Sequence, residues 1–370
     1  MPMDETVVAL APEVGRALAR AGPVPAAGRR TPLPRFLQIE PVGQCNLRCR
    51  MCPIELRPES ARGHPAAHMD YGTFTRLLDQ FPGIEQLQLQ GLGEPMMHPR
   101  FFDMVAHATA RGIQVTTNTN LTLLTDARAE ACVTSGLHTA HLSIDGATAA
   151  TYEHIRQRAR FPKVMRNLHR LVDAKRRLGS ATPHLRWVMV VMRENLHELA
   201  DAVRLAAEHG IPEMHVQHLC HDFQEASLPE RYRPMRDFVD AQTLLGDDPA
   251  RVRRHFEDAR RAADDAGLLL RLPDIRFPDD ATPAVPPVEP GRGRARCDWP
   301  WSGGYVSWDG RAMPCCMVST PDRLHFGNMA RDGVAAVWNA PAFEAFRERL
   351  DAADPPPEIC GRCSVWRGVF

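Results

Sequence analysis

The stretch RFLQIEPVGQCNLRCRMC, residues 35–52, combines the two features that decide the fold of this chain. Its first half, residues 35–43, is typical of a β-strand that ends at a proline and a glycine. Its second half places Cys45, Cys49 and Cys52 in a C-x3-C-x2-C spacing immediately after that strand. Three thiols in one short loop predict a metal or redox site at the end of a strand.

Strand-like and helix-like segments alternate after this loop. Further strands are expected at residues 84–91, 113–120, 139–146, 184–192 and 213–219. The intervening helices are expected at residues 69–81, 99–112, 125–136, 161–179 and 195–210. This alternation predicts a parallel sheet with helical crossovers. Right-handed crossovers would curl the sheet into a full or partial β/α barrel, and a flat doubly wound sheet is the competing arrangement.

Segments rich in proline and glycine divide the rest of the chain. Residues 1–35 are predicted to be an N-terminal extension and linker, and residues 36–275 form the main α/β unit. Residues 276–296 are a second linker, and residues 297–370 form a small domain rich in cysteine and tryptophan.

Composition narrows the class of protein. The chain has 370 residues and a formal net charge of zero, which gives no indication of nucleic-acid or anionic-membrane binding. Its start lacks the pattern of a signal peptide, and no run of eighteen apolar residues predicts a membrane span. We therefore expect a cytoplasmic protein. In that reducing compartment, ten cysteines favour metal binding or redox chemistry over disulfides.

The cysteines form two groups that differ in number. Three thiolates can hold three irons of a [4Fe–4S] cubane and leave the fourth iron open to a small molecule. A zinc ion with three cysteines and a water, or a chance grouping, is the competing interpretation. Four thiolates from the C-terminal group would close a second cubane, and a zinc ribbon fits its C-x2-C pair equally well. The C-terminal group comprises Cys297, Cys315, Cys316, Cys360 and Cys363.

The loop GQCNLRCRMCPIE, residues 43–55, resembles the cluster loop of the radical S-adenosylmethionine (SAM) enzymes. In that family the open iron binds SAM, and reductive cleavage of SAM releases a 5′-deoxyadenosyl radical. Three later segments resemble SAM-binding segments of the family in the same order: LQLQGLGEPMMHP (87–99), TTNTNLTLL (116–124) and HLSIDGATAATYEHIR (141–156). The first is a variant of the family's GGEP segment, because Leu92 separates its two glycines.

The resemblance implies a fold, a cofactor and a set of site residues. The fold is a partial (β/α)6 barrel with a small C-terminal iron–sulfur domain, and the cofactors are a [4Fe–4S] cluster and SAM. Cys45, Cys49 and Cys52 would hold the cluster. The implied SAM-binding residues are Gly91, Gly93, Glu94, Pro95, Thr117, Asn118, Asn120, Ser143, Asp145 and Arg156.

The C-terminal domain resembles the auxiliary-cluster region of the SPASM/Twitch subgroup of the same family. The subgroup's G-x4-C element matches Gly310 to Cys315, which favours Cys315 over Cys316 as a ligand. The number of cysteines favours one auxiliary [4Fe–4S] cluster. The implied ligands are Cys297, Cys315, Cys360 and Cys363.

The resemblance is strongest to enzymes of the 2-deoxy-scyllo-inosamine dehydrogenase type, which oxidise an aminocyclitol alcohol. We therefore expect an oxidoreductase of a carbohydrate-like small molecule in natural-product (antibiotic) biosynthesis, reduced by a flavodoxin or ferredoxin. Candidates for the base, chosen by their position at strand ends, are Arg193, His218 and His221.

Other activities stay open on the sequence. An epimerase would need a hydrogen-atom donor, for which Cys220 at the end of the last strand is the candidate, although a buried structural thiol is the default interpretation. A decarboxylase of a sugar-derived metabolite and a peptide-modifying maturase are further alternatives. The maturase is disfavoured because residues 1–35 are too short for a peptide-binding domain. A zinc-binding interaction protein would leave the glycine-rich and TTNTN segments unexplained.

Overall fold

The computed structural model describes residues 30–58, 66–219, 223–275, 277, 297–352 and 356–367. Within them, one mixed sheet contains nine strands in the order β11-β10-β1-β3-β4-β5-β7-β8-β9. The bounds of these strands are β1 Phe36–Ile39, β3 Gln86–Leu89, β4 Gln114–Thr119, β5 Thr139–Ser143, β7 His184–Val191, β8 Glu213–His218, β9 Leu269–Arg271, β10 Gly303–Val306 and β11 Ala312–Met313. A separate pair joins β2 (Arg48–Cys49) to β6 (Arg156–Gln157).

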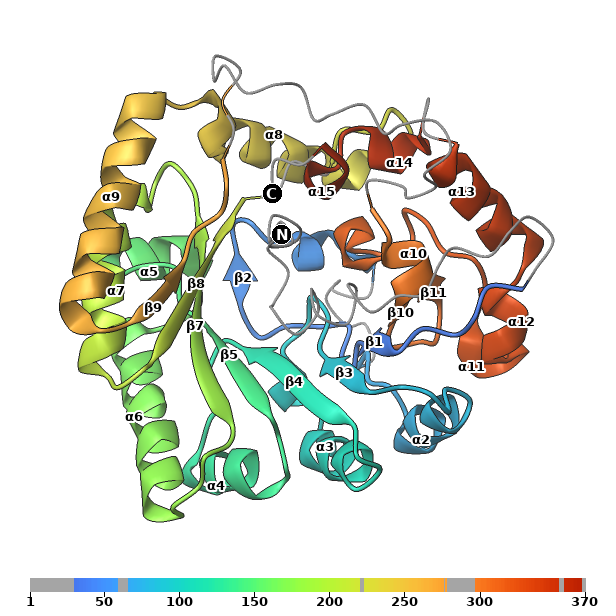
Figure 1. The fold of residues 1–370 in the computed structure, drawn as a ribbon, viewed down its shortest axis with the longest axis horizontal. Helices are drawn as coiled ribbons and strands as arrows, with labels where there is room; N and C mark the ends of the chain where they lie inside the picture. The colour runs from blue at the N-terminus through green and yellow to red at the C-terminus, as the bar shows by residue number, and fades with distance from the viewer. Residues whose placement is uncertain are drawn as a thin grey trace, which may run out of the picture.

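The six strands predicted from the alternation, β1, β3, β4, β5, β7 and β8, lie side by side and parallel. Figure 1 shows their crossover helices following one another round the outside of the curved sheet. These are α2 Tyr71–Asp79, α3 Phe101–Thr109, α4 Asp126–Thr134, α5 Ala149–Ile155, α6 Phe161–Arg177 and α7 Leu199–Glu208. Because the crossover helices cover one face, the partial barrel is confirmed and the doubly wound arrangement is wrong. In the described residues β11 and β9 are the edges, so the barrel is open.

The remaining helices lie after the last barrel strand. The longer ones are α8 Arg233–Gln242, α9 Pro249–Ala266 and α13 Pro341–Asp351. The short helices of the C-terminal domain are α10 Trp299–Ser302, α11 Met329–Asp332, α12 Val334–Trp338, α14 Glu358–Gly361 and α15 Ser364–Arg367. No helix among the described residues is long and apolar enough to cross a bilayer.

Local sequence explains where the helices begin and end. Asp70 caps α2 by accepting a hydrogen bond from the Thr73 N–H at 2.8 Å. α6 buries Val164, Leu168 and Leu171 along one stripe and ends in basic residues, which the negative end of the helix dipole favours. The core therefore forms between the helix stripes and the outer face of the sheet.

The C-terminal domain adds two strands to the barrel sheet. β10 pairs in parallel with β1, in a register that places Phe36 opposite Gly303 and Ile39 opposite Val306. β1 thus lies between β10 and β3, and both its edges are hydrogen-bonded. The strand that leads into the three-cysteine loop is therefore an interior strand of the sheet.

We predict that Leu37→Ala on β1 destabilises the protein by about 2–5 kcal/mol, because Leu37 is fully buried and truncation leaves a cavity. Thermal unfolding followed by circular dichroism checks this. Leu269→Ala, which truncates an exposed leucine on the outer strand β9, is the matched control and should change stability little. Equal shifts for the two variants would contradict the position assigned to β1.

Candidate active site and auxiliary metal centre

The three-cysteine loop is held in place by backbone hydrogen bonds on both sides. β2 contains Cys49 and pairs with β6, so that Cys49 lies opposite Arg156. The Arg50 N–H donates to the Ile155 carbonyl oxygen at 2.9 Å, and the Gly43 N–H donates to Ala67 at 2.8 Å. The loop is therefore fixed to the end of α5 and to the segment before α2.

Cys45, Cys49 and Cys52 line one cavity. Burial raises the pKa of the Cys49 thiol to about 12, and it also raises the pKa values of Cys45 and Cys52. Thiols in this state are neutral at neutral pH, so a bound metal must displace their protons. The full lining is Cys45, Leu47, Cys49, Met51, Cys52, Pro53, Ile54, Gln90, Gly91, Leu92, Gly93, Glu94, Asn118, Thr119, Asn120, Ser143, Arg156 and Val190.

The donor set fits a cluster better than a single ion. In the part of the chain that the structure describes, no three His, Cys, Asp or Glu side chains are arranged to hold one metal ion. A cubane instead takes each cysteine on a different iron, and three thiols around one cavity suit that requirement.

The glycines of the GLGEP segment are required by protein contacts. A Cβ at Gly91 would lie 2.0 Å from Cγ of Glu40, and one at Gly93 would lie 2.1 Å from the Val42 carbonyl oxygen. The loop between β3 and α3 therefore packs directly against the end of β1 and the start of the cysteine loop. This close approach brings the glycine segment and the thiols to the same cavity.

Glu94 organises the next strand end from a buried position. Its carboxylate accepts hydrogen bonds from the Thr119 hydroxyl and the Asn120 N–H, both at 2.8 Å, and from the Met96 N–H at 3.2 Å. Burial raises the pKa of this carboxyl, and these hydrogen bonds act in the opposite direction. Glu94 thus ties the loop after β3 to the end of β4.

The two asparagines of the TTNTN segment have different surroundings. The Asn120 amide nitrogen donates to Asn46 Oδ1 at 3.1 Å, while its oxygen accepts from the Thr122 hydroxyl at 2.6 Å, so this side chain supports the cysteine loop. Asn118 Oδ1 accepts from His141 Nδ1 at 2.8 Å. The His141 Nε2 atom accepts from Arg186 at 2.9 Å, which fixes that tautomer. The Asn118 amide nitrogen is therefore the end that can contact a ligand.

Arg156 lies between the cluster loop and a buried carboxylate. Its Nε donates to Asp145 at 2.6 Å, and its Nη1 lies 3.9 Å from the Cys49 sulfur. The Val190 N–H also donates to Asp145 at 2.8 Å. Asp145 is fully buried and orients Arg156 toward the loop.

The structure brings most of the predicted SAM-binding residues to the cavity. Those on it are Gly91, Gly93, Glu94, Asn118, Asn120, Ser143 and Arg156. Pro95, Thr117 and Asp145 are not among the lining residues. Pro95 begins a 3-10 helix, and the Thr117 hydroxyl donates to the Leu89 carbonyl oxygen at 2.9 Å across the sheet.

Two of the predicted base candidates lie away from this cavity. Arg193 bonds to the Ala241 and Gly246 carbonyl oxygens. His218 is buried, and its Nε2 accepts from the Leu244 N–H at 3.1 Å. Cys220 and His221 lie outside the described residues.

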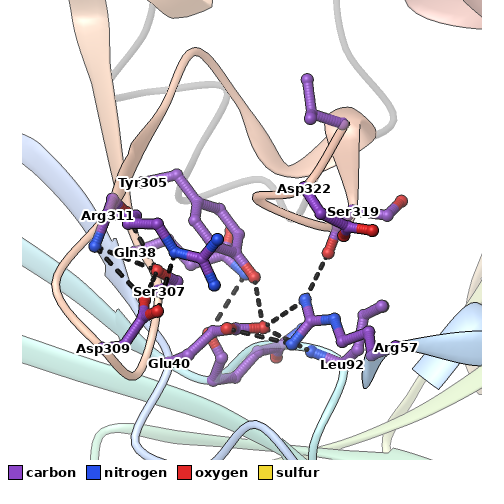
Figure 2. Close-up of polar contacts among 12 residues, drawn as sticks. Gln38, Glu40, Arg57, Leu92, Tyr305, Ser307, Asp309, Arg311, Ser319 and Asp322 are labelled. Atoms are coloured by element: carbon purple, nitrogen blue, oxygen red, sulfur yellow. Dashed lines mark hydrogen bonds and ion pairs between the residues drawn. The ribbon is translucent and has the colours of Figure 1, made fainter. Parts of the chain in front are cut away.

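A buried polar cluster that sequence reasoning missed joins β1 to the C-terminal domain. Figure 2 shows the Glu40 carboxylate receiving hydrogen bonds from Arg57, Tyr305 and Leu92. The distances are 2.9 Å to Arg57 Nη2, 2.9 Å to the Tyr305 hydroxyl and 3.2 Å to the Leu92 N–H. Arg57 also donates to the Ser319 carbonyl oxygen. Both charged side chains of the pair are completely buried.

This cluster connects four segments at one point. Arg57 follows the cysteine loop, Leu92 lines the cavity of the three cysteines, and Tyr305 and Ser319 belong to the C-terminal domain. Burial raises the pKa of Tyr305 well above its usual range, and the neighbouring Glu40 adds to this effect. The phenol therefore stays protonated and acts as a donor to Glu40.

The four predicted auxiliary ligands line a second, smaller cavity. Cys297, Cys315, Cys360 and Cys363 come from the start, middle and end of the C-terminal domain. Cys316 is not among the lining residues, although both Cys315 and Cys316 pack against the cluster of Tyr305, Met313 and Val318. The other lining side chains are apolar: Trp299, Pro300, Pro314, Met317, Phe346, Leu350, Val365 and Trp366.

One lining side chain, Trp299, has a buried polar atom with no hydrogen-bond partner among the described residues. This atom is the indole nitrogen Nε1. Four thiols around one otherwise apolar cavity suit a cubane in which each thiolate binds one iron. The residues present thus fit a closed iron–sulfur cluster.

Comparison with known proteins agrees with this geometry. A model of the radical SAM superfamily matches residues 39–206, and a model of the SPASM iron–sulfur cluster-binding domain matches residues 297–364. The chain is 30% identical over 346 residues to the AdoMet-dependent heme synthase of Methanosarcina barkeri, covering 90% of this chain and 89% of that protein. It belongs to the radical SAM superfamily and carries a C-terminal SPASM domain.

Two further similarities cover most of the chain. The tungsten-containing aldehyde ferredoxin oxidoreductase cofactor-modifying protein of Pyrococcus furiosus is 26% identical over 333 residues, covering 85% of this chain and 83% of that protein. The crystal structure of Streptococcus suis SuiB has the same fold, with a TM-score of 0.64 and 16% identity over 90% of this chain and 72% of that one. The family confirms the predicted cofactors: a [4Fe–4S] cluster with SAM, and auxiliary iron–sulfur chemistry in the SPASM domain.

We predict that Arg57→Leu destabilises the protein by about 3–5 kcal/mol, because it leaves the Glu40 carboxylate buried without its counter-charge. Tyr305→Phe should cost about 1–3 kcal/mol, since Arg57 remains. Thermal unfolding measures both. Arg204→Ala, which breaks the exposed pair with Asp201, is the control and should cost less than about 1 kcal/mol. A loss for Arg57→Leu no larger than for this control would contradict the buried pair.

Iron analysis tests the two ligand sets. Replacing Cys45, Cys49 and Cys52 together by alanine should remove about four irons per chain and leave the second cluster, and Cys315→Ala should impair the second cluster alone. Cys316→Ala and Cys132→Ala are matched controls, because neither cysteine lines a cluster cavity. Loss of iron in Cys316→Ala with full retention in Cys315→Ala would reverse the assignment.

Proposed function

We propose that this enzyme removes a hydrogen atom from a carbohydrate-like or aminocyclitol substrate and oxidises it from alcohol to ketone. Oxidation needs an acceptor for the second electron. The single observation that carries the proposal is the set of four thiols around one apolar cavity, since a cluster with all four irons ligated by protein has no position for substrate and suits electron transfer.

We assign the following roles to residues of the chain. Cys45, Cys49 and Cys52 would hold the SAM-binding cluster, and Cys297, Cys315, Cys360 and Cys363 would hold the auxiliary one. When bound, the two groups supply a 5′-deoxyadenosyl radical and a one-electron acceptor. Arg156, oriented by Asp145, offers a cation to the SAM carboxylate at the edge of the first cavity.

Polar groups on the first cavity support a hydroxylated substrate. Gln90 and Ser143 line it and carry groups that can hydrogen-bond to hydroxyls. A flavodoxin or ferredoxin would deliver the electron that cleaves SAM. We propose that the enzyme acts in a natural-product pathway in the cytoplasm.

A second candidate is modification of a larger cofactor precursor. It is favoured by the similarity, over most of the chain, to a heme synthase and to a cofactor-modifying protein. Epimerisation is a third outcome, with Cys220 as the hydrogen-atom donor.

Anaerobic reaction with SAM, dithionite and a panel of aminocyclitols and sugars tests the proposal. With deuterium at the reacting carbinol carbon, the label should appear in 5′-deoxyadenosine, and the product should be a ketone with one SAM consumed per turnover. Solvent deuterium in an otherwise unchanged product, lost in Cys220→Ala, would instead establish epimerisation. Turnover of porphyrin-type carboxylates without turnover of any sugar would favour the second candidate.

A further inference from the structure

Four polar side chains form a row across the barrel sheet, and the proposed chemistry leaves three of them unused. Asn118, His141, Arg186 and Glu213 are direct partners on the neighbouring strands β4, β5, β7 and β8 (Figure 1). Side chains that lie opposite one another in a sheet share one face. His141 and Arg186 are buried, whereas Asn118 ends the row and lines the cavity of the three cysteines. We call these four residues the polar row.

The hydrogen bonds of the polar row have a fixed direction. Burial, with Arg186 and His215 adding to it, lowers the pKa of His141 to about 3, so its ring is neutral at neutral pH and carries one proton. A guanidinium only donates, so His141 Nε2 accepts from Arg186 Nη1 at 2.9 Å and the proton lies on Nδ1. His141 Nδ1 then donates to Asn118 Oδ1 at 2.8 Å, which turns the Asn118 amide nitrogen away from the row.

Glu213 fixes the arginine at the far end of the row. Its Oε2 atom accepts from Arg186 Nε and Nη2, both at 2.8 Å. Its Oε1 atom accepts from His215 Nε2 at 2.6 Å and pairs with Arg271 at 3.3 Å. Burial raises the pKa of Glu213, but the hydrogen bonds from His215 and Arg186 outweigh it and lower the pKa to about 2. The carboxylate therefore stays ionised and holds the guanidinium in one orientation.

Asn118 differs from the other amides on the cavity. Within the described part of the chain its amide nitrogen has no partner and is not fully buried, so it is open to the cavity that Asn118 lines. The Asn120 amide nitrogen already donates to Asn46 at 3.1 Å. The Gln90 oxygen accepts from Gln88 at 3.2 Å, but an amide partner can itself turn over and imposes no direction.

We propose that Arg186 and Glu213 are positioning residues for SAM binding, because through His141 they hold the Asn118 amide as a hydrogen-bond donor to an acceptor atom of SAM. Without the row, half a turn of the Asn118 amide would present its oxygen, which accepts and cannot donate. The inference rests on the SAM site given under the proposed function and does not depend on the substrate.

The affinity of the reconstituted, anaerobic enzyme for labelled SAM, measured by equilibrium dialysis, tests this role. Asn118→Ala and Arg186→Met should each weaken SAM binding about 2- to 10-fold, the factor that loss of one neutral hydrogen bond carries. Because Arg186 acts through Asn118, adding Arg186→Met to Asn118→Ala should weaken binding no further. Arg271→Met is the matched control, since it removes another cation from Glu213 and leaves the bond between Arg186 and His141 intact. It should leave the affinity unchanged.

A second measurement locates the His141 proton and needs no substitution at Arg186. Nuclear magnetic resonance of the native chain with ¹⁵N-labelled histidine should show His141 protonated on Nδ1, and the spectrum of His141→Gln identifies its signal by loss. A proton on Nε2 in the native chain overturns the direction of the row. This readout stands even if Arg186→Met fails to fold.

The outcomes separate this inference from the proposed function. Weaker binding in both single variants, with no further loss in the double variant, supports the positioning role. Unchanged affinity in either single variant, or losses that add in the double variant, overturns it. The dehydrogenase proposal would then still stand, because SAM affinity does not depend on the substrate. Failure of the dehydrogenase proposal would appear instead in the deuterium experiment, as SAM bound and cleaved without an oxidised sugar.

Discussion

The buried ion pair between Glu40 and Arg57 is the contact on which the arrangement of both cavities depends. Two charges removed from water are stable only when their hydrogen-bonding atoms are occupied. Here the further partners are Leu92 on the three-cysteine cavity and Tyr305 and Ser319 in the C-terminal domain. Because a partial set would leave a buried charge poorly paired, the first strand, the glycine-rich loop and the C-terminal domain must take their positions together.

The barrel could be predicted because its signals are local. β7 is mostly apolar and ends in a valine-rich run, and α6 carries a clear apolar stripe, so each segment indicates its own structure. The pairing of β10 with β1 could not be predicted in this way. Gly303 and Gly304 are poor strand formers, so they do not indicate a strand in the sequence. Glycine is needed at both positions of β10 because Trp299 and Leu37 occupy the space that side chains would need.

In the candidate site, too, local features could be predicted and contacts between distant segments could not. Residue type and spacing located the two cysteine groups and the glycine segment. The direction of a side chain depends on the pleat, which explains why Asn118 lines the cavity while its neighbour Thr117 bonds across the sheet. Glu40 and Arg57 were missed because single charged residues are usually solvated, and no local pattern marks a pair that meets only after folding.

The position of β10 has a consequence for the order in which the protein is made. The ribosome releases β1 long before β10, so one edge of β1 stays without its partner while most of the chain is synthesised. An unpaired strand edge is a template for aggregation, and pairing over such a sequence separation is slow. The pairing of β1 with β10, and with it the contact between Glu40 and Tyr305, therefore waits until β10 has been synthesised.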